Sequence, residues 1–173
     1  MVQEVIWNIL RFVVVVALQV FVLNELRLGG FINPWLYLYF ILMLPIHIPG
    51  WLLLMVAFLT GFTIDVFSNT IGMHTLATVF LAFCRPGVLN FIAPREGYEF
   101  GLKPTISHLG IGWFLAYAGS LVFLHHTLLF FVEAFKLSEF FYTLFRVILS
   151  GIATMILLVL AQYLTYRKKG DTL

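Results

Sequence analysis

The chain has 173 residues, of which 62% are hydrophobic and only 10% are charged. A soluble domain usually carries roughly 25% charged residues, and at this size it could not hide so much apolar surface from water. The net charge of +2 does not indicate a nucleic-acid-binding protein, and the single cysteine, Cys84, excludes an intrachain disulfide. The composition instead fits a lipid bilayer as solvent, and we expect an all-α integral membrane protein with six transmembrane helices in one domain.

The first predicted helix covers about residues 5–26. A helix that crosses a bilayer needs about 20 predominantly apolar residues, and this stretch is long enough. Glu4 weakens the basic region that a signal peptide requires, and no small-residue cleavage motif follows the apolar run. We therefore expect that the first helix is retained as a membrane span.

The second and third predicted helices cover about residues 35–48 and 51–67. The apolar stretch that contains both is too long for one span, and Pro45 and Pro49 break it in the middle. We predict two short helices joined by a tight turn. A re-entrant pair of helices is the alternative interpretation.

The fourth predicted helix covers residues 71–84, and the polar residues at 68–70 before it suit a helix N-cap. A polar loop follows at 85–104, opening with an Arg-Pro-Gly break, and the apolar residues at 88–92 suit a short interfacial helix within it. The last two predicted spans are 107–131 and 138–166.

The basic residues predict the orientation of these spans, because Lys and Arg favour cytoplasmic loops. An even number of spans places both termini on one side, and the basic tail at 167–169 favours the cytoplasm for that side. Seven of the ten basic residues then lie on the cytoplasmic side: Arg11, Arg85, Arg95, Lys103, Arg167, Lys168 and Lys169. Only Arg27 and Lys136 lie outside, while Arg146 falls within the sixth span.

Two charged side chains within the predicted spans need an explanation. A charge at the bilayer centre costs roughly 2.5–3.5 kcal/mol on insertion scales, so Asp65 and Arg146 should have partners. Our hypothesis is that they form an ion pair inside the bundle. The alternatives are that Asp65 caps the fourth helix, or binds a cation or a partner's helix. Arg146 could instead extend toward the outer interface.

The fifth predicted helix carries His125 and His126, with Glu133 seven residues after the second histidine. Adjacent helical residues point about 100° apart, so the two histidines do not converge on one metal ion. We interpret the three residues as a polar outer end of this helix, with interfacial hydrogen bonding. No catalytic or phosphate-binding motif is found, and we expect no catalytic residue, metal or cofactor.

Small residues recur at four-residue spacing in the last two predicted helices. Such patterns allow close helix approach in lipid, and we expect them to serve packing within the chain, with a face for a partner's helix as the alternative. The positions are Gly112, Ala116 and Ser120, and then Ser150 and Thr154.

The segment 61–74, with the sequence GFTIDVFSNTIGMH, resembles the signature of the rod shape-determining protein MreD family. The shared pattern is a glycine, an aspartate four residues later, small polar residues, and then an Ile-Gly pair before an apolar helix. The family's aspartate corresponds to Asp65 and its glycines to Gly61 and Gly72. The loop at 94–99 and the His-His pair resemble one branch of the same family.

The resemblance implies a non-enzymatic scaffold of the cell-elongation machinery in the bacterial inner membrane. Proteins of this family act with MreC, the actin-like MreB, the glycosyltransferase RodA and a penicillin-binding transpeptidase to direct side-wall peptidoglycan synthesis. Their bundle is similar to the S-components of vitamin importers, so an importer subunit that binds a small molecule is the alternative. As a scaffold, the chain would receive the MreC transmembrane helix in a groove near Asp65 and the fifth predicted helix. The loop with Arg95 would contact a cytoplasmic filament or anionic lipid.

Overall fold

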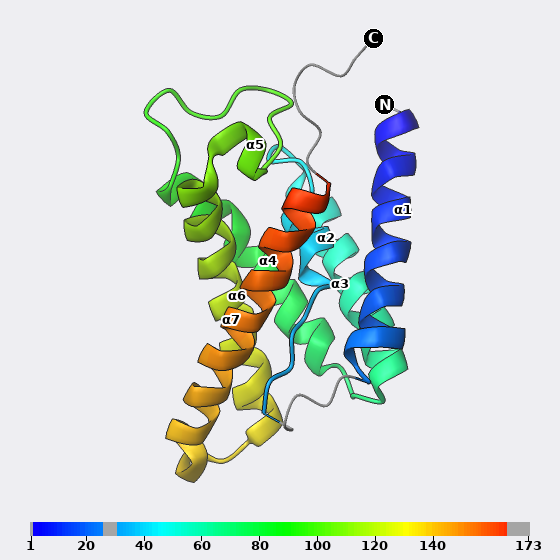
Figure 1. Cartoon of the computed structure of the whole chain (residues 1–173), viewed down its shortest axis with the longest axis vertical. Coiled ribbons are helices and arrows are strands. Elements are labelled where there is room, and N and C mark those ends of the chain that lie inside the picture. Colours follow the sequence, from blue (N-terminus) through cyan, green and yellow to red (C-terminus); the bar gives the residue numbers. More distant parts are fainter. Residues whose placement is uncertain (1, 26–30, 166–173) are drawn as a thin grey trace.

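The computed structural model describes residues 2–25 and 31–165, and the regular elements in these ranges are helices (Figure 1). In chain order they are α1 (Val2–Leu18) with a π-helical continuation (Gln19–Leu23), α2 (Leu38–Leu42), α3 (Gly50–Ser68), α4 (Met73–Phe91), α5 (Ile106–Leu109), α6 (Ile111–Ala134), a 3-10 turn (Leu137–Glu139) and α7 (Phe140–Leu164).

Among the described residues, four helices are long and apolar enough to cross a membrane: Ile6–Leu23, α3, α6 and α7. Their outer faces expose large apolar side chains, including Phe21, Phe58, Phe123 and Ile152. Soluble proteins rarely expose apolar surface so continuously, whereas lipid solvates it without cost. The prediction of an all-helical, multi-pass membrane protein is therefore confirmed at this level.

The predicted second helix, 35–48, is wrong. Only the five residues of α2 are helical, and the preceding residues 31–37 cross the interior of the bundle as irregular backbone (Figure 1). Irregular backbone is tolerated at membrane depth only when it is buried in protein with its polar groups satisfied. Side chains of the neighbouring helices provide this here, since Ser150 and Thr154 accept the N–H groups of Asn33 and Trp35 at 3.0 Å.

Further differences concern the ends of the later helices. α4 does not end at residue 84 but continues through Pro86 to Phe91, so the predicted interfacial helix at 88–92 is its last turn. The connecting loop begins only after Ile92, and α6 starts at Ile111 after the single turn of α5. α7 ends at Leu164, and the rest of the predicted sixth span lies outside the described residues.

The packing order places the irregular segment at the centre of the molecule. α3 packs on α4, α4 on α6 and α6 on α7, and α1 contacts α2. Leu38, Ile41 and Leu42 are fully buried among these helices. α1 begins and α7 ends at the same end of the bundle, while the α3–α4 and α6–α7 connections lie at the opposite end (Figure 1).

Candidate functional site

The carboxylate of Asp65 caps the N-terminus of α4. It accepts the backbone N–H groups of His74 and Thr75 at 3.0 and 2.9 Å, and the hydroxyls of Thr70 and Thr75 at 2.5 and 2.6 Å. The first N–H groups of a helix have no partners within the helix, and its positive dipole end favours an anion. The buried charge is therefore stabilised within the chain.

Two glycines complete the corner between α3 and α4. An ideal Cβ atom at Gly61 would lie 2.5 Å from the Thr75 Cα atom, so only glycine allows the two helices to approach this closely. Gly72, at the N-cap of α4, has φ of +74°, which side chains rarely adopt. Gly61, Asp65 and Gly72 thus act together to fix this corner.

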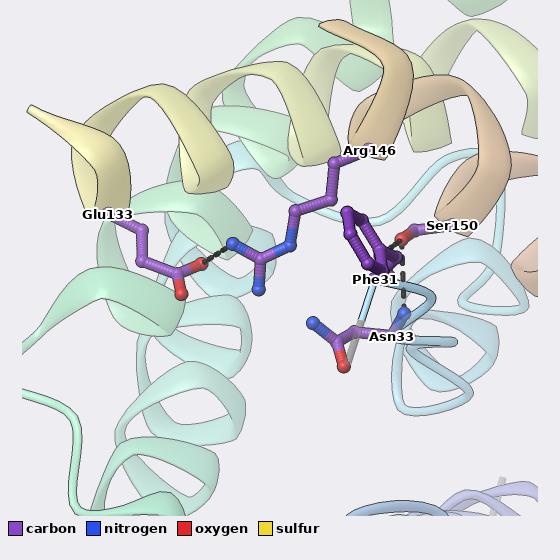
Figure 2. Close-up of polar contacts among 5 residues, drawn as sticks. All are labelled: Phe31, Asn33, Glu133, Arg146 and Ser150. Atoms are coloured by element: carbon purple, nitrogen blue, oxygen red, sulfur yellow. Dashed lines mark hydrogen bonds and ion pairs between the residues drawn. The ribbon is translucent and has the colours of Figure 1, made fainter. Parts of the chain in front are cut away.

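The predicted Asp65–Arg146 pair is wrong, and the alternative that Asp65 caps the fourth helix is confirmed. Arg146 instead pairs with Glu133 of α6, with 3.0 Å between Nη1 and Oε2 (Figure 2). Its guanidinium carbon also lies 4.3 Å from the centroid of the Phe130 ring. Asp65 fails as its partner because α4 already satisfies both carboxylate oxygens.

Arg146 and Glu133 belong to the wall of a polar pocket of about 350 Å³. The pocket lies where α1, α3 and α6 end and α4 begins, at the end of the bundle away from the start of α1. The other polar or aromatic side chains in its wall are Gln19, Asn24, Asn33, Trp35, Phe67, Ser68, Thr70 and His74.

His125 and His126 are fully buried in the middle of α6, so their prediction as part of a polar outer end is wrong. His125 Nε2 and His74 Nδ1 lie 2.7 and 3.1 Å from the hydroxyl of Tyr37. His126 Nε2 lies 3.1 Å from Thr154 Oγ1. The histidines thus hold the irregular segment against α4, α6 and α7.

The sequence-based prediction places Arg85 in the cytoplasmic loop, whereas the structure buries its side chain inside the bundle. The side chain is 1% exposed and donates to the carbonyls of Leu44 and Pro45 and to the Tyr117 hydroxyl, the last at 2.6 Å. It therefore satisfies backbone carbonyls that follow α2. No local signal marked Arg85 as buried in a helix, because Pro86 and Gly87 follow it directly and are typical of a helix break.

An apolar groove of about 510 Å³ runs between α6 and α7. Gly119 of α6 and Gly151 of α7 contribute to its surface, and larger apolar side chains line the rest. A Cβ atom at Gly119 would meet no atom within 4 Å, and one at Gly151 would only touch Val122, at 3.9 Å. The groove could therefore receive another apolar group.

Packing within the chain explains the second small-residue pattern but not the first. Gly112, Ala116 and Ser120 lie on the exposed face of α6, so packing within the chain does not explain them. Ser150 and Thr154 are fully buried, but they bind the irregular segment rather than bring two helices together. Arg95 is exposed in the loop after α4, as a residue that contacts a partner or lipid must be.

No group of three or more His, Cys, Asp or Glu side chains that could hold a metal ion occurs within residues 2–25 and 31–165. Comparisons with protein families, curated proteins and solved structures find no match to the chain. Function must therefore be argued from the polar corner, the pocket and the groove themselves.

Proposed function

We propose that this chain is a non-enzymatic scaffold of the bacterial cell-elongation machinery, resembling MreD. It positions side-wall peptidoglycan synthesis through MreC and, indirectly, MreB, RodA and a penicillin-binding protein. The observation that carries the proposal is the α3–α4 corner. The residues that correspond to the family's aspartate and glycines, Asp65, Gly61 and Gly72, have one shared architectural role there.

The proposed topology is six passes through the inner membrane with both termini in the cytoplasm. Support comes from Figure 1, where α1, the segment 31–48, α3, α4, α6 and α7 each run between the two ends of the bundle. Removing the buried Arg85 from the seven predicted inner basic residues leaves six in the sequence-based count, against two outside. Among the described residues, Arg95 and Lys103 lie between α4 and α5, and Lys136 lies between α6 and α7.

The MreC transmembrane helix binds in the groove between α6 and α7 rather than near Asp65. The groove is almost entirely apolar, so an occupant within the membrane must be apolar too. Its lining on α7 extends from Val147 to Leu160, which is about 20 Å along a helix. Gly119 and Gly151 would let a partner backbone approach closely, as small residues do in transmembrane interfaces.

Co-purification of MreC from detergent extracts tests this assignment. Gly119→Leu and Gly151→Leu fill the groove without a backbone clash, and we expect each to reduce the MreC retained several-fold. Gly112→Leu is the matched control, because it adds the same side chain to an open position on α6 outside the groove. Full retention by both groove variants would refute the docking site.

A second candidate function is a small-molecule-binding subunit of a vitamin importer, and the polar pocket favours it. A pocket of about 350 Å³ is at the small end of the range for ligand sites. Thermal unfolding of the purified chain across a panel of vitamins tests this candidate. A saturable rise in melting temperature with one vitamin would support the importer, and no rise across the panel would exclude those vitamins as ligands.

A further inference from the structure

The polar pocket contains a charged pair with unused hydrogen-bonding capacity (Figure 2). Arg146 uses Nη1 to bind Glu133, but its buried Nε has no hydrogen-bond partner among the described residues. A guanidinium carries five N–H donors in a rigid fork. Protein atoms enclose Nε, so the donor that is open to an oxyanion in the pocket is Nη2, which forms a charge-assisted hydrogen bond.

Glu133 and Asn33 provide the complementary groups. Glu133 binds Arg146 through Oε2, and its side chain is 39% exposed, so the second carboxylate oxygen can accept an ammonium group. The backbone N–H of Asn33 is held by Ser150 Oγ at 3.0 Å. In Figure 2 its side-chain amide nitrogen is turned toward the guanidinium, from where it can donate to the same oxyanion.

We propose that this pocket binds a zwitterionic group, with its oxyanion at Arg146 and Asn33 and its ammonium at Glu133. The Arg146–Glu133 pair has no net charge, so a simple anion would be repelled by the carboxylate and a simple cation by the guanidinium. A group with both charges a few ångströms apart matches both side chains. The amides of Gln19 and Asn24 complete a lining suited to a polar ligand.

Two sources supply this chemistry, namely a free amino acid and the phosphoethanolamine headgroup of a membrane lipid. Both combine an ammonium with an oxyanion, and both fit a pocket of about 350 Å³. The lipid source is compatible with the apolar Leu23, Phe67 and Leu129 that also line the pocket, because acyl chains need an apolar exit. The proposal does not depend on MreC binding, since none of these residues lines the groove.

The test is a titration of the full-length purified chain in detergent, followed by calorimetry and thermal unfolding. The probes are glycerophosphoethanolamine, a panel of neutral amino acids, a short-chain phosphatidylethanolamine and, as the anionic comparison, glycerophosphoglycerol. We expect saturable binding of at least one zwitterion and weaker binding of glycerophosphoglycerol. Binding of the phosphoethanolamine probes alone identifies a headgroup site, and binding of an amino acid identifies a free ligand.

Variants decide whether the binding occurs in this pocket. Arg146→Gln and Asn33→Ala should each weaken binding at least tenfold. Asn33→Ala retains the backbone bond to Ser150, so it also decides the matter if Arg146→Gln does not fold. Lys136→Gln is the matched control, because this exposed cation near the same end is outside the pocket. Absence of zwitterion binding, tighter binding of the anionic probe, or unchanged binding by Asn33→Ala would overturn the proposal.

Discussion

Gly61 of α3 and Thr75 of α4 approach so closely that a methyl group on Gly61 would lie 2.5 Å from the Thr75 Cα atom. The obstacle is backbone rather than a flexible side chain, so relief requires the helices to separate. We predict that Gly61→Ala lowers the free energy of unfolding by roughly 1–3 kcal/mol, the usual cost of overpacking. Thermal unfolding in detergent measures the effect.

Gly119→Ala is the control for that substitution. Its Cβ atom would have no neighbour within 4 Å, and alanine is a better helix former than glycine. We therefore expect Gly119→Ala to match or exceed the wild-type melting temperature. Equal stability of Gly61→Ala and Gly119→Ala would contradict the close contact between α3 and α4.

The cap on α4 predicts that Asp65 matters for folding rather than for direct partner contact. Asp65→Ala leaves the N–H groups of His74 and Thr75 without an acceptor, and each unsatisfied buried group costs about 1–3 kcal/mol. Asp65→Asn keeps one acceptor oxygen and should cost less. The order of melting temperatures is thus wild type, Asp65→Asn, Asp65→Ala.

Because Asp65 acts through the cap on α4, its substitution should change the stability of the protein as well as the binding of MreC. We expect Asp65→Arg to lower both the melting temperature and the MreC retained, whereas Gly151→Leu lowers retention alone. Fluorescence-detected size exclusion with heating, run beside the co-purification, measures both quantities on one sample. An Asp65→Arg protein that is as stable as wild type but has lost MreC would restore Asp65 as a contact residue.

The stability of the fold should also depend on the buried side chain of Arg85. Arg85→Met removes the donors to the carbonyls of Leu44 and Pro45, and about 1–3 kcal/mol is lost for each buried acceptor left unpaired. Tyr117→Phe leaves the Leu42 carbonyl and the Arg85 Nε without their partner, so we expect a comparable loss. A double-mutant cycle in thermal unfolding should show strong coupling, and additive effects would contradict the shared network.

The pairing of Arg146 with Glu133 is tested by a separate double-mutant cycle. The pair is partly exposed, so we predict a coupling free energy of roughly 1 kcal/mol or less between Arg146→Gln and Glu133→Gln. The cycle of Arg146→Gln with Asp65→Asn should give no coupling. Coupling to Asp65 instead of Glu133 would contradict the structure of the pocket.

The membrane class and most helix positions could be predicted because they depend on composition and on apolar length. α3, α6 and α7 lie near their predicted ranges, since about 20 apolar residues suffice to specify a span. One alternative for Asp65, that it caps the fourth helix, is also correct. This alternative could be recognised because the Ser-Asn-Thr run and the following helix lie close to Asp65 in the sequence. Capping residues can be predicted from the sequence because they lie close to the helix that they cap. Pairs of residues that are far apart in the chain cannot be predicted in this way.

The irregular segment could not be predicted, because its hydrogen-bond partners are distant in the sequence. The N–H groups of Asn33 and Trp35 are satisfied by Ser150 and Thr154, more than a hundred residues away, so nothing local marks residues 35–37 as non-helical. Arg85 was misplaced for the same reason, since its acceptors lie about 40 residues earlier. Distant partners decide both features, and only the fold reveals them.

Depletion of the protein in its host, followed by microscopy, tests the proposed scaffold function most directly. Cells that lose the protein should become round or swollen, and the wild-type gene should restore rods, as should Gly112→Leu but not the double variant of Gly119→Leu and Gly151→Leu. Depleted cells that stay rod-shaped and instead require a supplied nutrient would contradict the scaffold and favour the importer.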